Sequence, residues 1–229
     1  MRRARTIWAL VGLGLLFLAV QEFSWYALWR GVGGLSGDAA ARGRLAGTAT
    51  SDLAIFGHMV LGGVITLLAV VQWAGPLRRR WPRLHRVSGR TLAPLALITA
   101  VSGLIYIALR GTIGGPIMSV GFALYGGLMA VAAVQTYRHA RAHAIDAHRA
   151  WGLRLIVLCL GSWIYRVHYG IWYGITCTWG EATCRLGSRS DFSGVFDQIQ
   201  VFAFYLPYLL IVEWHLRRTG GAGGRVSAP

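Results

Sequence analysis

Four ionisable residues stand inside or beside long apolar runs and are the strongest candidates for chemistry in this chain. His58 and Arg166 lie about two turns inside the predicted outer ends of membrane helices, whereas His85 and His148 open helices at the predicted inner face. Even by the lower estimates, placing an arginine near the bilayer centre has a free-energy cost of roughly 2.5 to 3.5 kcal/mol. We therefore expect these positions to serve a function.

The elements that must position them are membrane helices. Hydrophobic residues make up 55% of the 229 residues and charged residues 14%, and the mean hydropathy is +0.50. Lipid offers no partners to backbone groups, so apolar runs of about 20 residues must be helical. We predict an all-α, polytopic membrane protein with a single domain of about six transmembrane helices over residues 1–218 and a disordered tail over residues 219–229. The predicted spans are Ile7–Tyr26, Leu53–Trp73, Thr91–Leu109, Pro116–Thr136, Trp151–Tyr173 and Ile199–Trp214.

The basic residues set the expected orientation. All 23 are arginines; sixteen lie on one side of the predicted spans and six on the other, with Arg166 inside. Because the richer side is expected to be cytoplasmic, both termini are predicted there, in a multi-pass protein of the inner (cytoplasmic) membrane. Arginines at helix ends suit topology and anionic lipid headgroups, so the net charge of +15 does not indicate nucleic-acid binding.

Helical spacing predicts two inward-facing stripes of small and polar residues. At 100° per residue, one stripe runs along the second span and the other along the fifth. Close helix packing explains the glycines in them, and snorkelling to the surface is an alternative for Arg166. The stripes are His58, Gly62, Ile65, Ala69 and Gln72, and His148, Gly152, Leu155, Cys159, Ser162 and Arg166.

His168 lies about 200° around the helix from Arg166, so the two side chains cannot point along the same radius. We favour Arg166 as the inward group. His168 is then expected to contact a different neighbour or the membrane interface.

The chain resembles an uncharacterised bacterial family of membrane proteins, domain of unknown function 2306. Two segments carry the resemblance, which covers residues 53–169 and implies a helical bundle without naming a reaction. The first contains His58, Gly62, Gln72, Arg78, Pro82, Leu84, His85, Arg86, Gly89 and Arg90, and the second contains His148, Arg149, Trp151, Arg154 and Arg166.

A looser likeness is to membrane cytochromes b, in which histidines of neighbouring helices hold haem. This likeness implies that His85 with His148 would ligate the iron of an inner haem b, and that His58 with His168 would serve an outer one. The inner histidines with Arg86 and Arg149 would otherwise bind an anionic group or a quinone oxygen. The metal-site alternative is His139 and His143 with Asp146.

The predicted function is binding of haem or quinone and passage of electrons through an inward-facing His/Arg seam, with a redox partner or the quinone pool as partner. The cofactor-binding candidates are His58, Gln72, His85, Arg86, His148, Arg149, Arg166 and His168. The alternative is a non-catalytic accessory or lipid-binding protein whose polar residues specify helix packing. A transporter ranks third, because acidic residues lie only near span ends. Whether the chain is an enzyme stays open.

Three features outside the spans complete the predictions. The exported stretch from Gly31 to Asp52 is expected to be an irregular surface loop, with Ser51 or Asp52 capping the second span. Cys177 and Cys184 share another exported loop, where they would form a disulfide in an oxidising compartment or stay as free thiols. Cys159 is predicted to be buried and unpaired.

Overall fold

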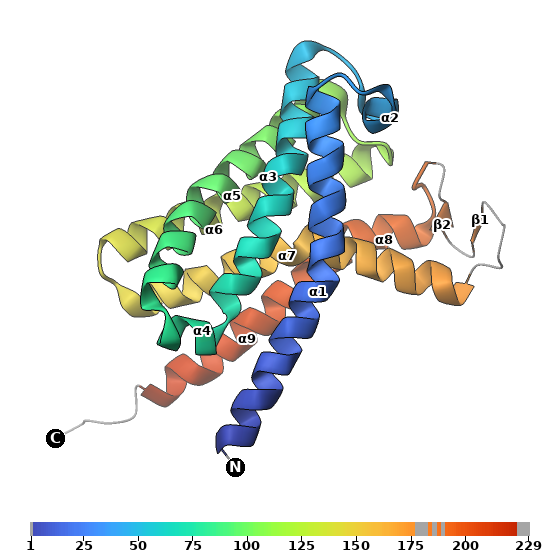
Figure 1. Ribbon diagram of the computed structural model, residues 1–229. Helices are drawn as coiled ribbons and strands as arrows, with labels where there is room; N and C mark the ends of the chain where they lie inside the picture. Colours follow the sequence, from blue (N-terminus) through green and yellow to red (C-terminus); the bar gives the residue numbers. More distant parts are fainter. Residues whose placement is uncertain (1, 177–182, 185–186, 189–190, 224–229) are drawn as a thin grey trace.

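The computed structural model describes residues 2–176, 183–184, 187–188 and 191–223 (Figure 1). Six of its helical segments are long and apolar enough to cross a membrane, which confirms the all-α class and the number of spans. The elements are α1 (Arg2–Leu35), α2 (Ala39–Arg42), the 3-10 helix η1 (Gly43–Leu45), α3 (Ala49–Trp73), α4 (Gly75–Arg80), α5 (Pro82–Arg110), α6 (Gly115–Arg141), α7 (Ile145–Thr176), β1 (Thr183–Cys184), β2 (Gly187–Ser188), α8 (Val195–Ala203) and α9 (Leu206–Gly223). The strands form one short antiparallel pair.

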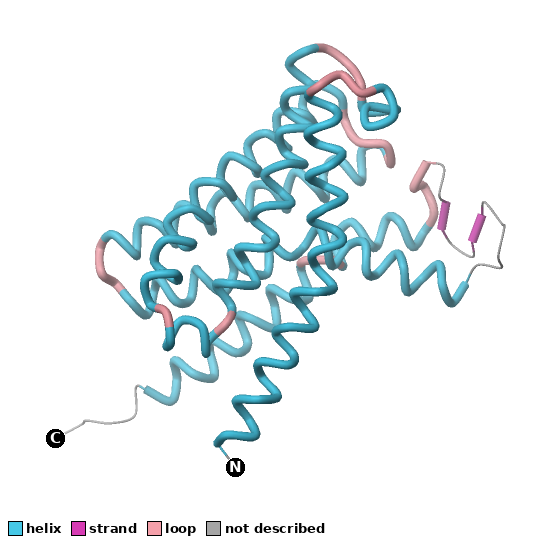
Figure 2. The backbone as a smooth tube through the Cα atoms, viewed as in Figure 1, coloured by secondary structure: helices cyan, strands magenta, loops and turns pink. Residues whose placement is uncertain are grey.

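The long helices form a bundle in which chain neighbours are also neighbours in space (Figure 2). α1 packs on α3, α3 on α5, α5 on α6 and α6 on α7, while α3 and α9 also contact α7. The start of α1 and the end of α9 lie at one end of the bundle, and α2 lies at the other (Figure 1). We call these the termini end and the α2 end. By the arginine distribution, the termini end is the predicted cytoplasmic face.

Aromatic and small residues fill the centre of the bundle. Phe204 and Tyr205 are completely buried, and their rings pack against Tyr125 of α6 at centroid distances of 4.9 and 5.4 Å. A glycine lets α1 approach α3: a Cβ on Gly34 would lie 2.2 Å from the buried ring of Phe56. The interior is therefore closely packed where no cavity is present.

The segment between the first two spans is more ordered than expected. α1 continues to Leu35, and α2 follows with Asp38 as its N-cap. Thr48, not Ser51 or Asp52, caps α3. Asp52 instead accepts hydrogen bonds from Arg42 and from the backbone N–H of Gly47, which ties the segment to α3. The predicted irregular loop was wrong because these polar contacts satisfy the backbone locally.

The last span consists of two helices, where the sequence suggested one. α8 ends at Ala203, and a turn at residues 204–205 precedes α9. Pro207 explains the break, because proline has no N–H to donate to the carbonyl of Ala203. The link between α5 and α6 is short, residues 111–114, and Pro116 stands in the first turn of α6.

The predictions for the C-terminal tail and for the three cysteines had different outcomes. α9 reaches Gly223, so the predicted tail begins as helix, and residues 224–229 lie outside the described part. Cys159 is buried and free, as expected. The predicted disulfide cannot be followed, because Cys177 and the side chain of Cys184 also lie outside the described residues.

Candidate functional site

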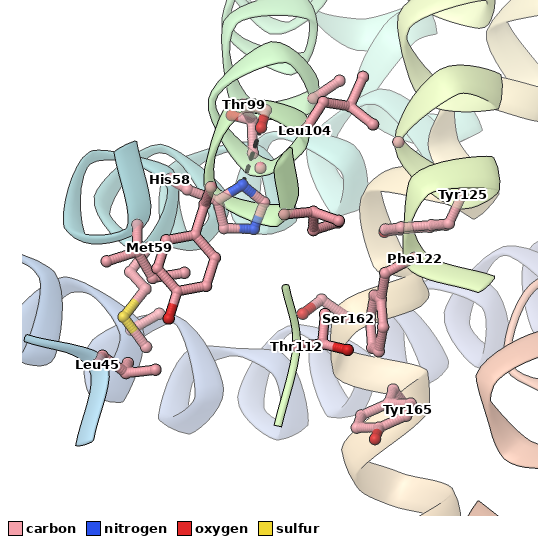
Figure 3. A pocket seen from close by; sticks show the side chains of 18 of the residues that line it. Leu45, His58, Met59, Thr99, Leu104, Thr112, Phe122, Tyr125, Ser162 and Tyr165 are labelled. Carbon is pink, nitrogen blue, oxygen red and sulfur yellow. Dashed lines mark hydrogen bonds between the residues drawn. The ribbon is translucent and has the colours of Figure 1, made fainter. Parts of the chain in front are cut away.

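A cavity of about 710 Å³ lies in the α2 half of the bundle and is lined from α1, η1, α3, α5, α6 and α7. This volume falls within the range of roughly 300–1,000 Å³ typical of small-molecule sites. Figure 3 shows His58 on one side of the cavity and Phe122, Tyr125 and Tyr165 on the other. The cavity is therefore the natural candidate for a ligand site.

His58 is held on the cavity wall by α5. Its Nδ1 lies 2.8 Å from the backbone carbonyl oxygen of Thr99 (Figure 3), and only Nδ1–H can be the donor in this contact. The ring fits because Gly103 has no side chain: a Cβ there would lie 3.0 Å from the imidazole. The orientation of the ring is thus fixed, with Nε2 left for the cavity.

Arg166 also lines the cavity, and its side chain keeps an exposed surface. Its Nη1 donates to the carbonyl and the hydroxyl of Ser162 at 2.9 and 3.0 Å, and its guanidinium lies 4.6 Å from the Phe23 ring centroid. Arg166 and His58 are close enough to interact electrostatically. Among the described residues, both hydrogen bonds of Arg166 use Nη1, which leaves donors on Nε and Nη2.

Three further arginines line the same cavity: Arg30, Arg44 and Arg110. Arg30 bonds to the carbonyl of Ala41 and the hydroxyl of Tyr26, and Arg110 to the carbonyl of Ala46, so these partners are uncharged. None of the described lining residues is an aspartate or a glutamate. The charged side chains among the described lining residues are therefore all arginines.

The wall opposite His58 is aromatic, with Phe122, Tyr125 and Tyr165 on it (Figure 3). Phe122 packs edge-on against Tyr165 at a centroid distance of 5.4 Å, and the Tyr125 hydroxyl donates to the Leu158 carbonyl. Gly161 is required behind this wall, because a Cβ there would lie 2.9 Å from the Tyr125 ring. An apolar ring system could stack here while polar groups contact the cationic side.

Both predicted stripes face inward. From α3, His58, Gly62 and Ile65 line the cavity, while Ala69 is completely buried. From α7, Cys159, Ser162 and Arg166 line the cavity, and Leu155 is buried below them. Helical periodicity thus identified the correct faces of both helices.

The predicted residues at the termini end are Gln72, His85 and His148, and none of them lines the cavity at the α2 end. His85 and His148 are close enough to interact electrostatically. His148 Nδ1 lies 3.0 Å from the Thr136 carbonyl, whereas the buried Nδ1 of His85 has no hydrogen-bond partner among the described residues. Gln72 bridges α3 to α5 by donating to the His85 carbonyl at 2.9 Å and the Ser88 hydroxyl at 2.6 Å. Gln72 therefore has a packing role.

The remaining predicted residues lie elsewhere. Arg86 and Arg149 are exposed. His168 faces α8 and α9, with its nitrogens 3.1 Å from Gln200 Oε1 and 2.8 Å from the Tyr208 hydroxyl. The predicted outer pairing of His58 with His168 is not formed, because the 200° separation turns His168 away from the cavity.

No group of three or more His, Cys, Asp or Glu side chains suited to a metal was found among the described residues, so His139, His143 and Asp146 form no such site.

Two features escaped the sequence analysis. Arg154 of α7 forms a two-pronged ion pair with Glu213 of α9, with N···O distances of 2.5 and 2.9 Å. Their matched depth near the same membrane face was the available signal. Arg30 and Arg110 were assigned to topology alone, and no sequence signal distinguishes a helix-end arginine that lines a cavity from one that contacts lipid.

Comparison with known proteins places the chain in a family. The model of the family described as "Predicted membrane protein (DUF2306)" matches residues 55–188, more than half of the 229 residues. No match was found among curated proteins or solved structures. The matched region contains both arms of the cavity site, His58 on α3 and Arg166 on α7. The chain therefore belongs to the DUF2306 family of predicted membrane proteins.

Proposed function

We propose that this multi-pass membrane protein binds a quinone-class molecule in the cavity at the α2 end and takes part in electron transfer. One observation carries the proposal: His58 and Arg166, from different helices, line a single cavity of about 710 Å³ whose other walls are largely apolar and aromatic. A quinone has a flat apolar ring with an oxygen at each end. It matches a cavity with polar groups on one side and ring faces on the other.

When bound, a quinone would supply the two-electron chemistry, and the residues of the chain would hold it. The free donors of Arg166 can hydrogen-bond one oxygen, and His58 can contact the other. Phe122 and Tyr165 provide faces for stacking.

Haem fits the cavity less well, because His58 is the one histidine among the described lining residues and His168 is engaged with Gln200 and Tyr208. A haem held by His85 and His148 stays a prediction. The two interact electrostatically, and the unpartnered Nδ1 of His85 is compatible with a further ligand, but neither residue lines the cavity at the α2 end.

The test is binding of a short-tailed ubiquinone or menaquinone analogue to the purified full chain in lipid nanodiscs. We expect saturable binding that is weakened in His58→Ala and in Arg166→Gln and is unchanged in His215→Gln, an exposed control near the termini end. Absence of saturable binding in either redox state of the quinone would overturn the proposal.

A second candidate, an anionic amphiphile such as a lipid acid, is favoured by Arg30, Arg110 and Arg166, whose hydrogen-bond partners in the described part of the chain are uncharged. The same assay discriminates between the two. If dodecyl phosphate or a fatty acid binds and the quinone does not, and if Arg30→Gln and Arg110→Gln weaken that binding, the cavity is a site for acidic lipids. Binding that falls steeply with salt would agree with this second function.

A further inference from the structure

The hydrogen bond between His58 and Thr99 fixes which nitrogen of the imidazole carries the proton. The partner is a backbone carbonyl, which can only accept, so Nδ1 of His58 must be the N–H nitrogen. In a neutral imidazole the other nitrogen then has a bare lone pair. Nε2 of His58, on the cavity wall, is therefore a hydrogen-bond acceptor (Figure 3).

The surroundings favour this neutral form. A second proton would place a positive charge close to Arg166 in a wall that already holds four arginines. No described lining residue is a carboxylate that could stabilise the extra charge. Two positive charges placed near each other in an apolar environment repel strongly. The His58 ring is therefore expected to stay neutral and to keep the lone pair on Nε2.

Arg166 offers the opposite chemistry. A guanidinium has five N–H donors and no acceptor, and in Arg166 the two hydrogen bonds to Ser162 use only Nη1. The cavity thus presents an acceptor from α3 and a donor from α7. A ligand that satisfies both must carry a hydroxyl hydrogen at one position and an accepting oxygen at another.

We infer that the cavity preferentially binds the reduced, dihydroxy form of its ligand, a quinol, whose hydroxyl donates to Nε2 of His58 while the other oxygen accepts from Arg166. The inference rests on the proposed function, since it names the form of the ligand that this site selects. An oxidised quinone has no hydrogen for Nε2, so two acceptors would face each other without a bond. One unmade hydrogen bond corresponds to about a tenfold difference in affinity.

The tautomer can be measured without any ligand. Nitrogen-15 NMR of histidine-labelled protein in nanodiscs, with His58→Gln used to assign the signal, should show a His58 ring protonated at Nδ1 only. A ring that is protonated at Nε2 and bare at Nδ1, or one that carries both protons near neutral pH, would overturn the inference.

The selectivity is measured as the ratio of quinol to quinone dissociation constants for one short-tailed analogue in its two redox states. Wild type and the His215→Gln control should bind the quinol about tenfold more tightly. His58→Ala should reduce this preference to near unity, and so should His58→Gln, whose amide can donate to a quinone or accept from a quinol. Equal wild-type affinities for both forms would contradict the inference and leave the proposed function intact, whereas failure of both forms to bind would remove the proposed function itself.

Discussion

The two ends of the bundle use similar residues in different ways. At the α2 end, His58 and Arg166 face a cavity, and Gly62 lines it with nothing within 4 Å of the position of a Cβ. At the termini end, the space beside Gly89 is occupied, because the amide of Gln72 lies 3.4 Å from where its Cβ would be. Small residues therefore leave a hollow at one end and admit a bridging side chain at the other.

This difference separates histidines that can reach a ligand from histidines that join helices. His58 and His148 make the same type of contact, each through Nδ1 to a backbone carbonyl, at 2.8 and 3.0 Å. Only His58 then lines a described cavity. The type and depth of an ionisable residue mark it as a candidate for a functional site. Whether a ligand can reach it depends on the space around its side chain.

The largest effect is expected from removing the positive charge of Arg166 from the cavity wall. Arg166→Gln should weaken quinol-analogue binding by about 10- to 100-fold, because hydrogen bonds to charged groups contribute about 1.5–3 kcal/mol. The matched change at the other end, Arg149→Gln, should leave binding unaltered, since Arg149 does not line the cavity. Titration in nanodiscs checks both variants, and equal losses would remove the distinction between the two ends.

A second contrast lies within one helix. In α7, Gly161→Ala would place a Cβ 2.9 Å from Tyr125, whereas Gly152→Ala would meet nothing within 4 Å. Overpacking of this kind costs about 1–3 kcal/mol, so Gly161→Ala should lower the thermal unfolding midpoint and Gly152→Ala should maintain or raise it. If Gly161→Ala is as stable as the wild type, the aromatic wall is less rigid than we describe.

The ion pair of α7 and α9 should contribute less. Glu213→Gln is expected to destabilise the fold by about 1 kcal/mol, because the Arg154 and Glu213 side chains remain 21% and 36% exposed and solvent screens their attraction. A double-mutant cycle with Arg154→Gln, read by thermal unfolding, isolates the pair. Additive effects of the two substitutions would show that the contact contributes no coupling energy.

The smallest effect on ligand binding is expected from a substitution at the termini end. His148→Ala should not change quinone or quinol affinity, because His148 lies outside the cavity. The same samples should be examined by reduced-minus-oxidised spectroscopy. A haem band that is lost in His85→Ala and His148→Ala but retained in His58→Ala would assign haem to this end. A loss of quinone binding in His148→Ala would contradict the separation of the two ends.

Much of the architecture could be predicted from local signals. Apolar runs gave six spans, and the 100° spacing correctly turned His58 and Arg166 inward, because backbone hydrogen bonding in lipid leaves little choice but a helix. The order around residues 36–48 could not be read in this way. It depends on contacts between residues ten positions apart, such as Arg42 with Asp52.

The sequence by itself determined the class of protein, the helices and the faces on which polar residues stand, since these follow from hydropathy and helical period. Only the tertiary structure decided that His58 shares a cavity with Arg166 and not with His168, that Arg30 and Arg110 join them, and that Gln72 closes the other end. The physical reason is that a cavity depends on how neighbouring helices approach and diverge. The distance between two helices depends on all the side chains packed between them. These side chains come from several segments of the chain, so no single segment determines the distance.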